Sequence, residues 1–206
     1  MLRCANIKEG DYVVDPFCGS GTILLEAMEM YRNTLRCFGM DISKKTIEGA
    51  RKNAAAENCG TNCSFVCGDA RTLRRHIADD ESVDAVVSNL PWGVMTGHRM
   101  DSNDLQTMYE VFLRTIWYTM KDRARVVMFV LRGLQMTRIL RKLGGRYRIL
   151  SANVVRTTNN LPSIIVAEKL AVDELHRSIK GQLTHLHQYV NINREIYETI
   201  HTENVE

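Results

Sequence analysis

The apolar residues of this chain change period repeatedly along its first 170 positions. Short runs rich in β-branched residues end at a polar residue or a glycine, which is the pattern of buried strands. These runs predict strands at 12–15, 36–40, 63–67, 83–88 and 126–131. Between the runs, apolar residues recur three or four positions apart, which is the pattern of amphipathic helices. They predict helices at 22–31, from Ser43 towards Gly60, at about 105–116 and at about 136–143.

Two further strands are expected at about 146–156 and at 163–169. The segment between them, 157–162, is too short for a helix, so this pair should be antiparallel. Strands that alternate with helices indicate a parallel sheet covered on both faces. We therefore predict an α/β domain at 1–170, with a doubly wound, mostly parallel seven-stranded sheet and a C-terminal antiparallel hairpin. Residues 171–206 are expected to be a partly helical extension whose end frays.

Polar residues stand where the predicted parallel strands end. In a doubly wound sheet these carboxyl ends meet at one edge, and ligands bind there. The four residues are Asp15, Asp41, Asp69 and Asn89. Asp15 leads into a turn that holds Gly19 and Gly21, and glycine permits both a positive φ and the close approach of a ligand. The turn therefore indicates a nucleotide-like ligand, and a plain tight turn is the alternative.

Asp41 follows the glycine turn by about twenty residues, the spacing expected of an acid that accepts hydrogen bonds from a ribose. A helix cap is the alternative role of Asp41. Asp69, after Gly68, is placed to accept a hydrogen bond from the amino group of adenine, or it is simply a turn acid. Both carboxylates therefore fit the binding of a nucleoside.

The segment Asn89–Trp92, with the sequence Asn-Leu-Pro-Trp, is the most specific feature. An asparagine amide oxygen accepts a hydrogen bond from an amino group, and a neighbouring backbone carbonyl accepts the second hydrogen. Pro91 fixes that backbone and adds no competing N–H, and Trp92 offers a flat face for a planar base. The segment indicates a site for an exocyclic amine, and a strand-ending turn with a core tryptophan is the alternative.

Charge is concentrated in one region although the net charge is only +3. From Lys121 to Arg156 there are ten lysines or arginines and one acid, Asp122. Such a surplus indicates a polyanionic partner, and a solvated basic surface is the alternative. Among these residues we expect Arg132 to lie nearest the site.

The cysteines and the N-terminus bear on the setting of the protein. The six cysteines include no Cys-x-x-Cys pair, which argues against a zinc site. We expect reduced, buried thiols in a cytoplasmic or nuclear protein. The sequence lacks a signal-peptide pattern and any apolar run near the ~20 residues of a membrane span, so no membrane is expected.

Taken together and in this order, the segments Asp15–Gly21, Asp41, Gly68–Ala70 and Asn89–Trp92 resemble class I S-adenosylmethionine-dependent amino-methyltransferases. Residues 1 to about 170 look most like the catalytic domain of THUMP-associated RNA guanine-N2 methyltransferases, which have a Rossmann-like fold. DNA adenine methyltransferases are less similar, because they carry a long target-recognition insertion after this last motif.

The resemblance implies S-adenosyl-L-methionine as the cofactor and no metal. The cofactor-binding residues that it implies are Asp15, Cys18, Gly19, Ser20, Gly21, Asp41, Ile42, Asp69 and Ala70. Within this set, the glycine turn surrounds the methionine part, Asp41 holds the ribose and Ile42 packs on the adenine. The catalytic residues that it implies are Asn89, Pro91 and Trp92, which receive the target amine.

The resemblance also implies partners. The expected substrate is structured RNA, with transfer RNA first and small nuclear RNA as an alternative. Eukaryotic members also need a small zinc-binding activator protein. Members carry an RNA-binding THUMP domain ahead of this region, and this sequence has none, so we expect a fragment, a separately expressed domain or a short isoform.

The expected reaction is therefore methylation of the exocyclic N2 amine of a guanosine in RNA. An adenine-N6 methyltransferase and a protein glutamine-N5 methyltransferase of the same fold remain alternatives, because both need an Asn-x-Pro-aromatic clamp. A non-catalytic, methyltransferase-like module that binds RNA or a partner is an alternative from another class.

Overall fold

The computed structural model divides the chain into two compact units, Met1–Leu170 and Ala171–Glu206. It describes residues 1–77, 79–95, 98–99, 101–158 and 160–171. Apart from Ala171, the predicted helical extension at 171–206 lies outside the described residues. The account of the fold therefore concerns the first unit.

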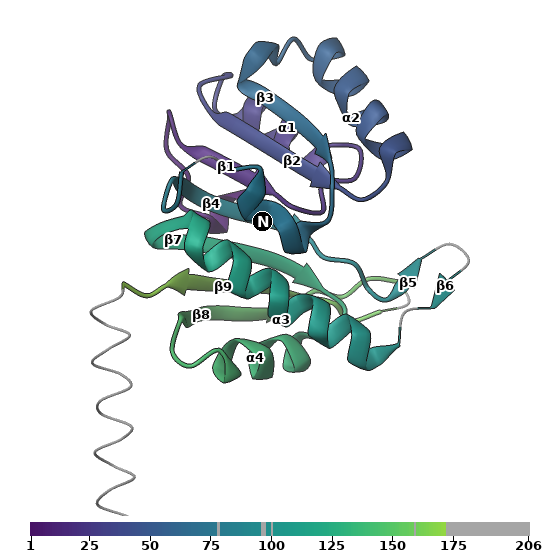
Figure 1. The fold of residues 1–206 in the computed structure, drawn as a ribbon, viewed down its shortest axis with the longest axis vertical. Coiled ribbons are helices and arrows are strands. Elements are labelled where there is room, and N and C mark those ends of the chain that lie inside the picture. Colours follow the sequence, from purple (N-terminus) through teal and green to yellow (C-terminus); the bar gives the residue numbers. More distant parts are fainter. Residues whose placement is uncertain (78, 96–97, 100, 159, 172–206) are drawn as a thin grey trace, which may run out of the picture. The chain divides into compact units, whose positions relative to one another are not determined.

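Seven strands form one sheet in the order β3-β2-β1-β4-β7-β9-β8 (Figure 1). The strands are β1 (Tyr12–Asp15), β2 (Arg36–Asp41), β3 (Cys63–Cys67), β4 (Val83–Asn89), β7 (Met120–Val130), β8 (Tyr147–Val154) and β9 (Ser163–Lys169). The first five of these are parallel, and β9 is antiparallel to both of its neighbours, β7 and β8. The predicted doubly wound sheet with its antiparallel hairpin is confirmed.

Four α-helices and three short 3₁₀ helices connect the described strands. They are α1 (Thr22–Met30), α2 (Lys44–Ala56), α3 (Ser102–Thr119), α4 (Gly133–Lys142), η1 (Leu2–Cys4), η2 (Gly60–Asn62) and η3 (Ala70–Arg75). Ser43 caps α2 as expected, because its hydroxyl accepts a hydrogen bond from the Thr46 amide at 3.3 Å. The predicted end of this helix at Gly60 is wrong, because Asn58 already turns the chain with a φ of +53°.

A short hairpin was not expected from the sequence. β5 (Val94–Met95) and β6 (His98–Arg99) form a separate antiparallel pair between β4 and α3. Figure 1 shows this hairpin beyond the end of β4, away from the seven-stranded sheet. A strand of only two residues is too short to show an alternation of apolar and polar positions in the sequence.

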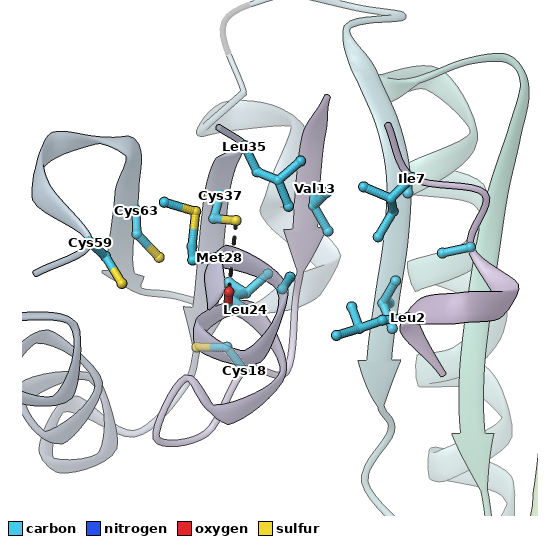
Figure 2. Close-up of a cluster of buried hydrophobic side chains, with 14 of the residues drawn as sticks. Leu2, Ile7, Val13, Cys18, Leu24, Met28, Leu35, Cys37, Cys59 and Cys63 are labelled. Atoms are coloured by element: carbon cyan, nitrogen blue, oxygen red, sulfur yellow. Dashed lines mark hydrogen bonds between the residues drawn. The ribbon is translucent and has the colours of Figure 1, made fainter. Parts of the chain in front are cut away.

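Both faces of the sheet are covered. Successive residues of a strand point to opposite faces, so Val13 lies on one face and Val14 on the other. Val13 belongs to a buried cluster with Leu24 and Met28 of α1 and Ile47 of α2 (Figure 2). In Figure 1, α3 passes in front of the strands, whereas α1 lies behind them. The sheet is therefore held between two packed layers.

The cysteines only partly match the expectation of buried thiols. Four of the six are buried, and Figure 2 shows Cys18, Cys37, Cys59 and Cys63 among the apolar side chains. The expectation is wrong for Cys67, which is exposed because it ends the edge strand β3, and Cys4 is partly exposed. All six are free thiols.

Gly39 in β2 gives a test of this packing. A Cβ atom there would lie 2.5 Å from the Phe65 ring and 2.9 Å from the Cys18 sulfur. We expect Gly39→Ala to lower the free energy of unfolding by about 1–3 kcal/mol, because the buried ring must shift. Urea denaturation followed by circular dichroism measures this change in the free energy of unfolding.

The matched control is Gly49→Ala in α2. A Cβ atom at Gly49 meets nothing within 4 Å, so this change should stabilise the helix by about 1 kcal/mol. Equal effects of the two substitutions would contradict the proposed close packing at Gly39.

Candidate active site

The turn between β1 and α1 is built around Asp15. Its carboxylate accepts hydrogen bonds from the Ser88 hydroxyl at 2.6 Å and from the Phe17 amide at 3.1 Å. The side chain is buried, with 1% of its residue surface exposed. Burial raises the pKa of Asp15 to about 7, although both hydrogen bonds act in the opposite direction. Asp15 therefore stabilises the turn through the Phe17 amide and connects β1 to β4 through the Ser88 hydroxyl.

Two glycines of this turn have conformations that other residues rarely adopt. Gly19 has a φ of +54° and Gly21, which precedes α1, a φ of +87°. A Cβ atom at Gly19 would meet nothing within 4 Å, so the space over the turn is open. A Cβ atom at Gly21 would lie 3.0 Å from the Phe65 ring. Gly19 leaves room for a ligand, and Gly21 permits close packing of α1.

Asp41, at the end of β2, is connected directly to this turn. One carboxylate oxygen accepts a hydrogen bond from the Gly19 amide at 3.1 Å, and the other accepts one from the Ser43 amide at 2.8 Å. The side chain that caps α2 belongs to Ser43, so the alternative role of Asp41 as the cap residue is wrong. Asp41 holds the glycine turn against the end of the neighbouring strand.

A cavity of about 540 Å³ opens at this edge of the sheet. Six of the predicted site residues line it, namely Asp41, Ile42, Asp69, Ala70, Asn89 and Pro91. Ile42 is 65% exposed, which is unusual for a large apolar side chain and gives the cavity a bare apolar wall. The volume suits a small-molecule ligand.

The other predicted site residues do not line this cavity. They are Asp15, Cys18, Gly19, Ser20, Gly21 and Trp92. Cys18 is buried, and burial raises the pKa of its thiol well above the usual value, so it stays neutral. Gly19 nevertheless adjoins the cavity through its hydrogen bond to Asp41.

Asp69 is partnered by an arginine that the sequence did not single out. Both of its carboxylate oxygens accept hydrogen bonds from the Arg71 guanidinium, at 2.5 to 3.0 Å. This pairing lowers the pKa of Asp69 below its usual value, so the group is ionised at neutral pH. Asp69 also caps η3 by accepting a hydrogen bond from the Arg71 amide at 2.9 Å. Asp69 thus combines the expected turn role with a place in the cavity wall.

The segment Asn89–Trp92 is fixed by its neighbours. The Leu90 amide donates a hydrogen bond to the Phe129 carbonyl at 3.0 Å, which extends the pairing of β4 with β7. The Tyr109 hydroxyl of α3 donates a hydrogen bond to the Pro91 carbonyl. Asn89 is exposed at the cavity, whereas Leu90 is buried. The side-chain amide of Asn89 is therefore held at the cavity by a backbone that is tied on both sides.

Trp92 is placed differently from the expectation of a free stacking face. Its ring lies against Phe129, with centroids 5.6 Å apart and an angle of 58° between the planes. It is half-buried, and its indole Nε1 has no hydrogen-bond partner among the described residues. This packing fits the alternative of a core tryptophan more closely.

Sequence reasoning missed the contribution of α3. Its first two turns supply Asp104, Thr107 and Met108 to the cavity wall, and Tyr109 positions Pro91. The spacing of these three residues puts them on one side of a helix. A signal was present, because the helix pattern begins soon after Asn89–Trp92, but the tertiary approach of α3 cannot be read from that pattern.

The basic stretch 121–156 is divided between opposite edges of the sheet. β7 begins beside the start of β4, so Lys121 and Arg123 lie at the amino ends of the strands, where they pair with Asp84 and Glu168. Arg132 follows β7 at the carboxyl end and donates a hydrogen bond to the Ser102 hydroxyl at 3.2 Å. Only part of the stretch can therefore face a ligand at the cavity.

The strand order, with β9 antiparallel between β7 and β8, defines a class I methyltransferase with a Rossmann-like fold. Its cavity lies at the carboxyl ends of β1, β2, β3 and β4, which is where proteins with this type of sheet bind their ligands. The chain belongs to the family of RMKL-like methyltransferase domains, UPF0020, whose model matches residues 1–160.

Three comparisons make the relationship more specific. A tRNA (guanine(6)-N2)-methyltransferase of Thermus thermophilus is 32% identical over 170 residues, which cover 82% of this chain and 48% of the relative. The U6 snRNA (guanine-N(2))-methyltransferase THUMPD2 of Bos taurus is 34% identical over 93 residues, 45% of this chain and 18% of the relative. The crystal structure of TrmN from Thermus thermophilus has a TM-score of 0.71 and 32% identity, covering 82% of this chain and 47% of that one. The chain thus spans about half or less of these relatives.

S-adenosylmethionine is the methyl donor of this family, and the cavity residues fit it. Asp41 presents a carboxylate at the end of β2, where a ribose is expected. The bare side chain of Ile42 offers an apolar surface for a planar ring. The open space above Gly19 leaves room for the rest of the molecule.

None of the described helices is long and apolar enough to cross a membrane. Within the same part of the chain, no group of three or more histidine, cysteine or acidic side chains is arranged to hold a metal ion.

The raised pKa of Asp15 predicts a pH dependence of stability. The folded protein holds this proton up to about pH 7, whereas the unfolded chain releases it above about 3.8. The folded state thus binds more protons in this window, so the free energy of unfolding falls as the pH rises from 4 to 7. The fall is up to about 4 kcal/mol, and Asp15→Asn should remove it.

Urea denaturation at several pH values measures the difference between the wild type and Asp15→Asn. Asp79→Asn, which removes an exposed carboxylate, is the control and should leave the pH profile unchanged. Parallel pH profiles of the wild type and Asp15→Asn would contradict a raised pKa.

Proposed function

We propose that this domain transfers a methyl group from S-adenosylmethionine to the exocyclic N2 amine of a guanosine in RNA, with transfer RNA as the first candidate substrate. The observation that carries the proposal is that Asn89 and Asp41 line the same cavity. This arrangement brings an acceptor for an amine beside an acceptor for a ribose. The Thermus relative, named for N2 methylation of guanine in tRNA, supports the choice of base and of RNA.

The cofactor is held by residues that follow three strands, β1, β2 and β3. The backbone of the Gly19–Gly21 turn faces the methionine part, the Asp41 carboxylate accepts hydrogen bonds from the ribose hydroxyls, and Ile42 packs on the adenine. Asp69 and Ala70 meet the edge of the adenine. When bound, S-adenosylmethionine supplies an electrophilic methyl group on a sulfonium.

The target amine is held by Asn89 and a backbone carbonyl. The Asn89 side-chain oxygen accepts one hydrogen of the amine. The carbonyl that accepts the second hydrogen is that of Leu90 or Pro91, since the oxygen of Pro91 has a second lone pair besides the one that accepts the hydrogen bond of Tyr109. Two acceptors localise on the exocyclic nitrogen a lone pair that the guanine ring otherwise delocalises. They also orient this lone pair towards the methyl group of the cofactor. Positioning then supplies much of the rate.

The target guanosine must leave its stack to reach this cavity. Trp92 supports the Asn89–Trp92 backbone through its packing on Phe129 and does not itself stack on the base. The role of Arg132 is to bind a phosphate of the RNA near the cavity. Its hydrogen bond to the Ser102 hydroxyl supports its position there.

Small nuclear RNA is the second candidate substrate. The bovine relative named for N2 methylation of U6 snRNA favours it. Adenine-N6 and protein glutamine-N5 methylation use the same type of clamp, but both relatives are named for guanine N2. A non-catalytic module would not need the glycine turn, Asp41 and Asn89 together.

Partners and location follow from the proposed reaction. The relatives are about twice as long as the matched region or longer, which supports an additional RNA-binding domain in the working enzyme. A small zinc-binding activator remains an expectation of the resemblance alone. The substrate RNAs are found in the cytoplasm and the nucleus, which are the two proposed locations.

Asn89→Ala tests the proposal. Loss of the amide oxygen leaves the amine without one of its two acceptors, so kcat should fall about 100-fold or more. The assay is the amount of N2-methylguanosine in digested small RNA, determined by mass spectrometry after incubation with labelled S-adenosylmethionine. It is run with the chain alone and with the chain fused to the RNA-binding domain of a relative. Cofactor affinity by calorimetry should change little.

Asn62→Ala is the matched control, because Asn62 lies before β3, at the opposite end of the strands. It should leave product formation unchanged. Full turnover by Asn89→Ala would refute the assigned role of Asn89. N6-methyladenosine or methylglutamine as the product would replace guanine N2 as the target, and absence of cofactor binding would favour the non-catalytic module.

Tyr109→Phe tests the positioning of the clamp. The substitution keeps the ring but removes the hydrogen bond to the Pro91 carbonyl, so we expect kcat to fall about tenfold without a change in cofactor affinity. Tyr147→Phe is the control, because Tyr147 is also a buried phenol that donates to a backbone carbonyl, that of Leu113, at 2.6 Å. Both variants should lose about 0.5–1.5 kcal/mol of stability. Equal kcat values would assign Tyr109 a purely structural role.

A further inference from the structure

A second cavity lies between η3 and α3. It has a volume of about 400 Å³. Its walls are formed by Arg71, Thr72, Arg74, Arg75, Val111, Arg114, Thr115 and Tyr118. We call it the η3–α3 groove. Of these residues, only Arg71 also lines the candidate active site.

The groove carries a surplus of positive charge. Four of its eight lining residues are arginines. Arg71 is paired with Asp69, and Arg74 is paired with Asp80. Arg75 and Arg114 are exposed and have no carboxylate partner among the described residues. Two guanidinium groups therefore remain available to an anion.

The walls of the groove are joined. The Thr115 hydroxyl of α3 lies 3.2 Å from the Arg71 carbonyl of η3 and 2.9 Å from the Val111 carbonyl of its own helix, so its single hydrogen is shared between the two acceptors. Arg74 lies over the ring of Tyr118, with 4.9 Å between the guanidinium carbon and the ring centroid. These contacts hold the two walls at a fixed separation, so little ordering is needed when a ligand binds.

The groove adjoins the candidate active site. Arg71 lines both the 540 Å³ cavity and the groove. η3 begins directly after Asp69, and α3 supplies Thr107 and Met108 to one cavity and Val111 and Thr115 to the other. An RNA whose target nucleotide is held at Asn89 extends beyond this cavity, and the groove begins at Arg71 on the cavity wall.

We propose that the η3–α3 groove binds the phosphodiester backbone of the RNA at a point outside the target nucleotide. This inference rests on the proposed function. Arginine suits this role because its planar fork donates two hydrogen bonds to a phosphate. Tyr118 is 41% exposed, and the guanidinium of Arg74 rests on its ring, which keeps that charge at the groove. An acidic protein segment would match the charge, but the substrate of the proposed reaction is itself a polyanion and needs no additional partner.

The test is the double substitution Arg75→Gln with Arg114→Gln. The probe is a fluorescein-labelled tRNA transcript with guanosines at positions 6 and 10, and binding is measured by fluorescence anisotropy at several KCl concentrations. We expect about tenfold weaker binding near 0.1 M salt, and a slope of log K against log salt that is smaller by about 1.5 to 2. Cofactor affinity and kcat at saturating RNA should be unchanged, because neither residue lines the first cavity.

The matched control is Lys45→Gln with Lys52→Gln. Both lysines are exposed on α2, which packs with α1 rather than with η3 or α3, and their loss removes the same two charges. This control should keep more than half of the wild-type affinity and the same salt slope. Equal losses in the two double variants would overturn the proposal, because only a general charge effect would then remain.

The remaining outcomes are also decisive. Unchanged affinity and salt slope in the groove variant would overturn the proposal. Wild-type binding of poly-glutamate as tight as that of the tRNA, and lost in the groove variant, would overturn it in favour of an acidic protein. N2-methylguanosine formation is measured in parallel, so a groove that binds RNA in an inactive protein would refute the proposed function and support the groove.

Discussion

The central position of β1, between β2 and β4, determines where every functional group of this domain lies. Because the three strands are parallel, their carboxyl ends bring the glycine turn, Asp41 and Asn89 to one edge. Hydrogen bonds then fix this arrangement, since Asp41 accepts from the Gly19 amide and Asp15 accepts from Ser88 of β4. A shift of β1 in either direction would separate Asp41 and the glycine turn from Asn89.

α3 contributes to both cavities and also to the clamp. Its first turns line the 540 Å³ cavity, Tyr109 donates a hydrogen bond to the Pro91 carbonyl, and its later turns form one wall of the η3–α3 groove. The same helix buries Phe112, Leu113 and Ile116 against the sheet. The apolar side of α3 thus gives its polar side a rigid base, which is a common way to place reactive groups.

The fold and half of the site could be predicted from the sequence because both depend on local patterns. Alternating periods revealed the strands and helices, and the residues that end strands are adjacent to those patterns, as with Asp41 and Asn89. Tertiary neighbours have no such signal. The pairing of Asp69 with Arg71, the packing of Trp92 on Phe129 and the division of the basic stretch between two edges all depend on which elements meet in space.

Arg71 stands in the walls of two cavities and pairs with Asp69 in one of them. Under the two proposals, a ligand that donates a hydrogen bond to the Asp69 carboxylate would compete with this pairing and leave the Arg71 guanidinium free for an anion in the groove. Occupancy of the two cavities would then be linked thermodynamically through one side chain. Linkage of binding free energies is reciprocal, so a cofactor that tightens the grip on RNA is itself held more tightly, by the same factor, once the RNA has bound.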